Sequence, residues 1–274
     1  MIKLLNAGFT RLKKDKLFWG LTVVVIGFAL IMLYNAYSDM LEYGGNVSVD
    51  EYFFNVGMLI GFAIAIFASV YLGNEYSNGT LRNKIVMGHN RIKIYLSNLI
   101  IVSIISVFWV LLFDFVTACI GIPLFGNIQM DIGKFLLLFV IVLLLSIAFA
   151  SIFTFIAMVC SNKTATSIIC LVTVFAMMFG STMLFNLLSA PPTTVEYSMV
   201  DGQFEPQEVP NPRYPTEQER KIYQTILNIM PQGQAFSIVG YEDWDYKALP
   251  FYSLGVIIIF TGAGLIIFKR KDLK

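Results

Sequence analysis

Charged residues are scarce in this chain, and their scarcity excludes most classes of soluble protein. They make up 14% of the 274 residues, whereas hydrophobic residues make up 57%. A soluble globular domain has about 25% charged residues. The formal net charge is +1 at pH 7, so no excess of positive charge predicts binding to nucleic acid. The composition therefore predicts a membrane protein.

Histidine and cysteine are also rare, which removes several kinds of chemistry. His89 is the one histidine, so we expect no metal site built from histidines and no Ser-His catalytic pair within the membrane. Cys119, Cys160 and Cys170 lie in or beside apolar runs and imply no disulfide framework. The chain has no G-x-x-x-x-G-K-[ST] phosphate-binding loop. We expect no enzyme, no catalytic residue and no cofactor in this chain.

Six apolar runs are long enough to cross a membrane, because about twenty helical residues span a hydrocarbon core of about 30 Å. Backbone groups in lipid must bond within their own segment, and the runs are too long for barrel strands. The sequence therefore predicts an all-α membrane protein, with residues 1–274 forming one transmembrane domain. The predicted spans are residues 17–38, 52–72, 94–121, 135–160, 165–189 and 249–268.

Lysine and arginine predict how these spans are oriented, because they gather in cytoplasmic loops. They precede the first span, lie between the second and third and between the fourth and fifth, and follow the sixth. The alternate loops are acidic or carry little charge, including the long segment 190–248. We therefore expect both termini to be cytoplasmic in a multi-pass protein of the cell membrane.

The N-terminal residues 1–16 combine apolar and basic side chains. Ile2, Leu4, Leu5, Phe9 and Leu12 alternate with five lysines and arginines. This pattern favours a helix in the cytoplasmic interface, in contact with anionic membrane lipid. A plain positively charged tail is the alternative. A cleaved signal peptide is disfavoured, because the following apolar run is longer than such a segment uses.

The polar interval between the second and third spans predicts a short cytoplasmic helix. Ser77, Asn78 and Gly79 should break the second span, Thr80 can cap a new helix from Leu81 to Met87, and Gly88 should end it. Asn90 should then cap the third span. Leu81 and Ile85 lie on one face of the short helix, which we expect to enter a groove on a partner protein. The alternative is a helix lying flat on the bilayer.

The string Glu75-Tyr76-Ser77-Asn78-Gly79-Thr80-Leu81 in this position, followed by a basic cluster, resembles the permease subunits of ABC-2 type transporters. The resemblance implies a coupling helix seated on separate ATPase subunits, which would hold ATP and Mg. It also implies a second permease copy or a related permease, and export by alternating access. The implied coupling residues are Glu75, Gly79, Thr80, Leu81, Arg82, Lys84, Ile85 and Arg91.

The apolar spans fit amphipathic cargo such as a peptide, an antibiotic or a lipid better than small ions. A channel, or a scaffold that docks a cytoplasmic protein without transporting anything, is the alternative function. A neighbouring ATPase gene would favour the transporter over both. Segment 190–248 is longer than in many permeases of the resembled family.

The first part of segment 190–248 is rich in proline and acidic residues and should be extended. Thr216 and Glu219 then form a capping box that begins a helix, and Pro231 and Gly233 should end it. Its apolar face would either form an outer lid over the translocation path or simply cover the helix ends. The proposed lid residues are Ile222, Tyr223, Ile226 and Leu227.

Two features stand out within the spans. Small residues repeat every four positions in the second span, which predicts a seam where another helix packs closely, within this chain rather than between chains. Asp114 is an acidic residue well inside the third span, and such groups are candidates for a translocation path. A structural partner or a hydrated outer vestibule would explain Asp114 equally well. The residues of the seam are Gly57, Gly61, Ala65 and Ser69, continued by Gly73.

Overall fold

A computed structural model describes residues 1–44, 48–200, 203–240 and 245–271. Its helices include six that are long and apolar enough to cross a membrane, which confirms the predicted all-α membrane fold with six spanning helices. Most extend beyond the apolar runs, because helical hydrogen bonding continues into polar residues at both ends. These helices are α2 (Lys16–Tyr43), α4 (Val56–Ser77, preceded by the single turn α3, Asp50–Phe53), α6 (Arg91–Phe125), α7 (Ile132–Val159), α8 (Lys163–Leu188) and α11 (Leu249–Arg270).

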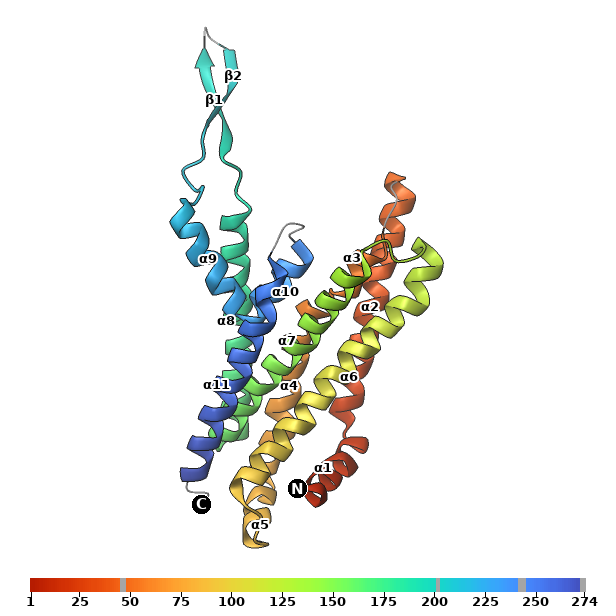
Figure 1. The fold of residues 1–274 in the computed structure, drawn as a ribbon, viewed down its shortest axis with the longest axis vertical. Helices are drawn as coiled ribbons and strands as arrows, with labels where there is room; N and C mark the ends of the chain where they lie inside the picture. Colours follow the sequence, from red (N-terminus) through yellow and green to blue (C-terminus); the bar gives the residue numbers. More distant parts are fainter. Residues whose placement is uncertain (45–47, 201–202, 241–244, 272–274) are drawn as a thin grey trace.

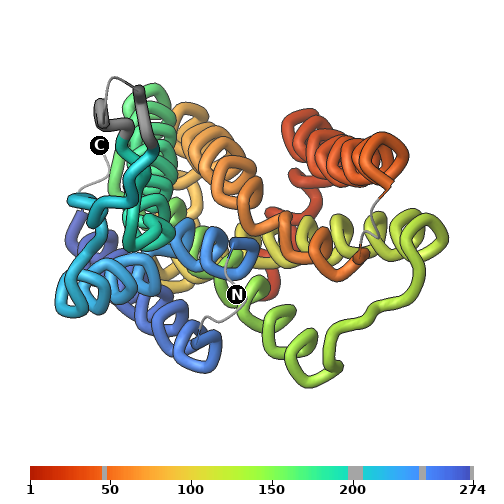
Figure 2. The backbone as a smooth tube through the Cα atoms, turned by 90° about the horizontal axis from the view of Figure 1, so that it is seen from above, coloured from red at the N-terminus to blue at the C-terminus, as the bar shows by residue number. Residues whose placement is uncertain are grey.

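The second span, α4, lies at the centre of the bundle and contacts α2, α6, α7, α8 and α10. In its most apolar window 72% of residues are buried, against 17% for α8 and 22% for the span that contains α11. Seen from above, α2 stands on one side of the bundle and α8 and α11 on the other (Figure 2). The peripheral helices therefore expose broad apolar faces.

The small residues of α4 explain its central position. A Cβ atom added at Gly57 would lie 3.1 Å from the Cβ of Ala235 in α10, and one at Gly61 would lie 2.8 Å from the Phe149 ring in α7. One added at Gly73 would lie 3.0 Å from Lys163. The stripe therefore receives other helices of the same chain, as small residues in membrane helices do.

One end of the bundle carries α1 (Ile2–Lys13), the short helix α5 (Thr80–Val86) and both ends of the chain (Figure 1). Helix α1 packs on α6, with Leu4 and Leu12 buried, while Lys3, Lys13 and Lys14 are exposed. Asp15 then caps α2 by accepting hydrogen bonds from the backbone of Leu17 and Phe18. Within the described part of the chain, the basic helix α1, the basic segment around α5 and the basic end of α11 thus lie at the same end of the bundle.

The opposite end carries the long segment between α8 and α11. Strands β1 (Thr193–Val200) and β2 (Gln203–Pro210) pair antiparallel and project beyond the helices (Figure 1). An extended conformation was predicted for these residues, but their pairing was not. Helix α9 (Glu217–Ile229) begins with the predicted Thr216–Glu219 capping box. Hydrogen bonds from Thr216 lower the pKa of Glu219.

The prediction that the helix from Thr216 ends before Pro231 and Gly233 is confirmed, but the helix that follows it was not predicted. Helix α9 ends at Ile229, but Pro231 begins a further helix, α10 (Pro231–Gly240), because proline is tolerated at a first helical position. Gly233 lets α10 approach α9, since an added Cβ would lie 2.3 Å from the carbonyl oxygen of Leu227. Helix α10 is largely buried against α4, α7 and α8, and the short 3-10 helix η1 (Tyr246–Ala248) leads into α11.

Candidate functional site

The link from α4 to α5 is a tight turn that depends on glycine. Gly79 has a φ of 65°, in the left-handed region that favours glycine, and it occupies the position before the first turn of α5. Gly88 has a φ of 85° and follows the end of the helix. Asn90 then caps α6, as predicted, by accepting a hydrogen bond from the backbone of Ile92. The short helix therefore lies where the sequence predicts it.

Thr80 does not cap α5, although the sequence suggested that it would. Its hydroxyl donates to the carbonyl oxygen of Glu75 over 3.0 Å, and α5 has no side-chain cap. The reason is that Gly79 takes the capping position, which moves Thr80 into the first turn. Thr80 therefore ties α5 back to the last turns of α4.

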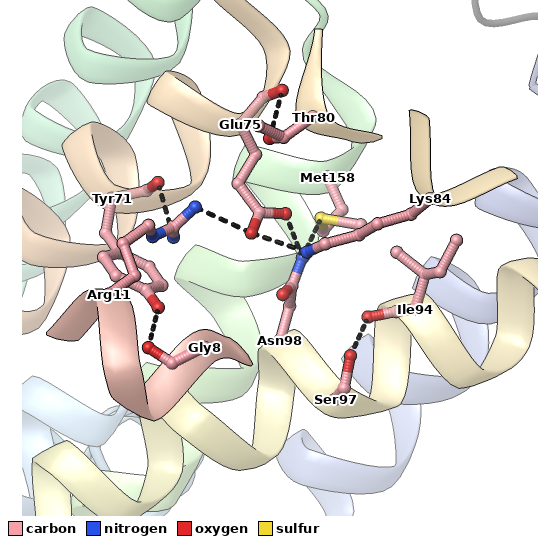
Figure 3. Close-up of polar contacts among 10 residues, drawn as sticks. All are labelled: Gly8, Arg11, Tyr71, Glu75, Thr80, Lys84, Ile94, Ser97, Asn98 and Met158. Atoms are coloured by element: carbon pink, nitrogen blue, oxygen red, sulfur yellow. Dashed lines mark hydrogen bonds and ion pairs between the residues drawn. The ribbon is translucent and has the colours of Figure 1, made fainter. Parts of the chain in front are cut away.

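Beneath this turn lies a buried group that we call the Glu75 cluster: Arg11, Glu75, Lys84 and Asn98. Glu75 is 2% exposed. Its Oε1 atom accepts from Arg11 Nη1 at 2.8 Å and from Lys84 Nζ at 2.7 Å. Its Oε2 atom accepts from Asn98 Nδ2 at 3.0 Å. One carboxylate thus connects α1, α4, α5 and α6 (Figure 3).

Arg11 makes further contacts that fix α1 against α4. Its Nη2 donates to the carbonyl oxygen of Tyr71 over 3.2 Å, and its guanidinium lies 3.6 Å from the centre of the Tyr71 ring. The Tyr71 hydroxyl in turn donates to the carbonyl oxygen of Gly8 (Figure 3). A buried carboxylate is stable only when charges and hydrogen bonds compensate its lost hydration, and here cations from two helices do so.

The prediction that Leu81 and Ile85 form the docking face of α5 was wrong. Leu81 is 1% exposed and belongs to the hydrophobic core, and Ile85 packs against that core, so neither offers an apolar face to the cytoplasm. The helix is too short to stand away from the bundle and uses these side chains to pack on its own chain. Its exposed side chains are instead Arg82, Asn83, Val86 and Met87, and Val86 and Met87 are 78% and 69% exposed.

Two basic residues assigned to coupling have structural contacts. Lys84 has a side chain only 16% exposed because it pairs with Glu75. Arg91 Nη1 donates to the carbonyl oxygens of Lys269 and Lys271, so it holds the end of α11 against α6. Of the predicted basic group, Arg82 is the one whose side chain is exposed on α5.

Lys271, which sequence reasoning missed, joins the ends of three spans near the Glu75 cluster. Its Nζ atom donates to the Tyr76 hydroxyl over 3.0 Å and to the carbonyl oxygens of Met158 and Val159 over 3.1 and 2.7 Å. Burial lowers the pKa of Lys271 to about 8, while the nearby Cys160 raises it. These acceptors at the C-terminal end of α7 compensate part of the cost of burying an ammonium group.

Asn98 was also missed, although a signal for it was present. It is a polar side chain inside an apolar span, and such residues usually have a polar partner. It is 1% exposed and bonds to both Glu75 Oε2 and Met158 Sδ. Its partner Glu75 lies 23 positions away, so the pairing depends on how α4 and α6 cross.

The remaining candidates lie away from this cluster. Asp114 is 9% exposed in α6, and its Oδ1 atom, like Thr117 Oγ1 one turn further on, has no hydrogen-bond partner among the described residues. In α9, Leu227 is buried but Ile222 and Ile226 are 57% and 39% exposed. The structure does not bring these residues together with the Glu75 cluster. Within the described ranges, no group of three or more metal-ligating side chains occurs.

Comparison with known proteins adds one match. The family model described as ABC-2 family transporter protein matches residues 4–190. The matched region runs from α1 through α8 and so contains the whole Glu75 cluster. A search of curated proteins finds no match to the chain.

Proposed function

The chain belongs to the ABC-2 family of transporter proteins, and on this premise we propose that it is the membrane subunit of an exporter whose ATPase subunits bind at α5. The observation that carries the proposal is the Glu75 cluster. Because Lys84 of α5 and Arg11 of α1 share one oxygen of Glu75, a displacement of α5 must move α1 and α4 or break buried ion pairs. A force applied to α5 would therefore reach the central span.

The exposed surface of α5 has the composition of a docking site. Val86 and Met87 are two large apolar side chains beside the exposed Arg82 and Asn83. Apolar anchors with a polar rim are typical of a protein interface, and methionine adapts to irregular partner surfaces. In this proposal the partner ATPase binds ATP and Mg, and this chain binds neither.

The rest of the architecture follows from the same proposal. The end with α1, α5 and both termini is cytoplasmic, which agrees with its lysines and arginines. Six spans form half of the membrane pathway, so a second permease, identical or related, completes it. Alternating access then exports an amphipathic cargo such as a peptide, an antibiotic or a lipid.

At the outer end we propose that α9 and α10 close the path. The buried Leu227 connects α9 to the bundle, while Ile222, Tyr223 and Ile226 form the adjoining lid surface. Asp114 is proposed to line the path, and the lack of a hydrogen-bond partner for its Oδ1 atom among the described residues supports this role. A polar cargo group or water would provide the missing hydrogen bond.

The experiment changes both Val86 and Met87 to Asp. Burying two unpaired carboxylates in a protein interface costs several kcal/mol, so the variant should lose its ATPase during purification. Asn6→Asp with Ala7→Asp is the matched control, because these residues are also exposed at the same end of the bundle but lie on α1. Arg82→Ala should have a smaller and more salt-sensitive effect. A Val86 and Met87 variant that still retains the ATPase and transports normally would show that α5 is not the docking site.

A further inference from the structure

The β1–β2 hairpin has two edges, and they differ in a way that no transport step described above explains. Its register runs without interruption from the pair Thr193–Pro210 to the pair Val200–Gln203. In the described part of the chain the sheet consists of these two strands, and the hairpin projects beyond the helices (Figure 1). Each strand therefore has one edge that no further strand of the described chain covers.

A hydrogen bond at the base of the hairpin shows which backbone groups point outward. Asn211 donates its backbone N–H to the carbonyl oxygen of Pro192 over 2.9 Å, and this pair continues the register by one step. Hydrogen-bonded and non-hydrogen-bonded pairs alternate in an antiparallel ladder, so Thr193–Pro210 and every second pair after it are of the second kind. Residues of these pairs direct their N–H and C=O groups away from the partner strand. They are Thr193, Val195, Tyr197 and Met199 in β1 and Phe204, Pro206, Glu208 and Pro210 in β2.

The outer edge of β2 is blocked, whereas that of β1 is open. Pro206 and Pro210 have no backbone N–H, so half of the outward positions of β2 lack a donor. Proline and lysine on an exposed edge are common protections against pairing with another chain. Strand β1 contains neither. It therefore keeps a complete row of outward donors and acceptors for a third strand.

The charge of the hairpin indicates which kind of segment suits this edge. The two strands contain Glu196, Glu205 and Glu208 and no lysine or arginine. Glu196 is exposed and belongs to β1 itself, so a residue directly opposite it on a third strand would have its Cβ about 5 Å away. Opposite charges at such positions stabilise strand pairing and like charges weaken it. A basic segment therefore suits the edge, and an acidic one does not.

We propose that the outer edge of β1 binds a basic peptide as a third strand of the sheet. The eight residues of β1 are about 27 Å long, so they pair with about eight peptide residues. The backbone groups provide the affinity, and Glu196 selects positive charge. In the proposed orientation the hairpin lies outside the cell, so the peptide comes from that side. The inference does not depend on the docking of an ATPase at α5.

A second permease fits this edge less well. Two copies that cross the membrane in the same direction are related by an axis along the membrane normal, and the hairpin extends along the bundle (Figure 1). Such an axis makes the two β1 strands parallel and places each outward residue opposite its own counterpart. In a parallel ladder an outward residue must instead lie opposite an inward one, because its slanted bonds reach the two neighbours of that residue. Contact between two permeases along their helices therefore leaves this edge open.

The test is the binding of fluorescent eight-residue peptides to the full chain in a neutral detergent, measured by fluorescence anisotropy without ATP. A lysine-valine repeat is the probe, and a lysine-proline repeat of the same charge is its control, because proline disfavours strand pairing. We expect the lysine-valine peptide to bind at least about tenfold more tightly, since the control lacks several backbone N–H groups.

Two proline variants distinguish the edges of the hairpin. Tyr197→Pro removes an outward N–H from β1 and should weaken binding of the lysine-valine peptide about fivefold, as loss of one hydrogen bond does. Phe204→Pro is the matched control, because it also replaces an aromatic residue at an outward position, but in β2. Glu196→Gln should weaken binding about threefold at low salt, whereas Glu217→Gln, at an exposed position of α9, should not.

Several results would overturn the proposal. One is equal affinity for the two peptides, and another is equal affinity of Tyr197→Pro and the unchanged protein for the lysine-valine peptide. Equal losses in the two proline variants would show an effect on the whole hairpin rather than on its β1 edge. A Val195→Cys variant that crosslinks to a second copy in membranes, beyond the level given by the three native cysteines, would show that a second permease occupies the edge.

Discussion

Changing Glu75 to Gln tests whether the Glu75 cluster connects α5 to the bundle. Glutamine keeps the shape and can still accept from Asn98, but it leaves Arg11 and Lys84 facing each other without a carboxylate. Each ion pair has a gross Coulomb energy of about 6 kcal/mol at its observed distance and an effective dielectric constant of about 20. Desolvation offsets most of this energy.

The net loss of stability is smaller than this gross Coulomb energy, and the solvent exposure of Arg11 and Lys84 reduces it further. Removing one partner of a fully buried pair costs about 3–5 kcal/mol. Here the side chains of Arg11 and Lys84 are 33% and 16% exposed, so water screens the unpaired cations in part. We expect Glu75→Gln to lower the free energy of unfolding by about 2–3 kcal/mol.

A double-mutant cycle isolates the pair. Glu75→Gln, Lys84→Met and the double variant are unfolded by titration with SDS in mixed micelles, followed by circular dichroism. Because Lys84→Met removes one of the unpaired cations, the double variant should lose less than the sum of the single variants, by about 1 kcal/mol or more. Losses that add within about 0.3 kcal/mol would refute the claim that Glu75 and Lys84 stabilise each other.

Three further predictions concern packing, topology and the chain end. Gly61→Leu should lower the yield of folded protein, because its Cβ alone would lie 2.8 Å from Phe149. Gly27→Leu is the control and should not lower the yield, because no atom lies within 4 Å of its added Cβ. Equal yields of the two variants would contradict the packing of α4. A cysteine at Gln207 should react with an impermeant thiol reagent in intact cells, and one at Asn83 should not. The parent protein gives the background labelling, and labelling at Asn83 would show that the topology is the reverse of the one proposed. Lys271→Met should increase cleavage of the C-terminal residues by protease, because it removes three hydrogen bonds, and unchanged cleavage would show that they do not hold the chain end.

The sequence predicted the parts of this fold that depend on local pattern. Apolar length defines the six spans, and Asn90 and the Thr216–Glu219 box begin helices where their side chains can cap them. Glycine in the left-handed region at Gly79 and Gly88 bounds α5. Each of these signals acts over a few residues, so no knowledge of helix packing is needed to read it.

The errors concern residues whose environment is set by distant parts of the chain. Leu81 on a two-turn helix has the same pattern whether its apolar side meets a partner or its own core, and only the packing decides. Arg91 and Lys271 resemble ordinary flanking charges until α6, α7 and α11 come together. Pro231 follows the end of a helix, as predicted, but the helix α10 that begins there was missed, because it depends on the close approach to α9 that Gly233 allows.

Purification of the chain from its own membranes, without added partners, tests the central claim most directly. The account predicts that a subunit with a phosphate-binding loop co-purifies and hydrolyses ATP, and that both the subunit and the hydrolysis are lost when Val86 and Met87 are changed to Asp but not when Asn6 and Ala7 are. If the chain instead purifies without any ATP-hydrolysing subunit and conducts ions by itself after reconstitution, it acts as a channel and the proposed coupling through α5 is wrong.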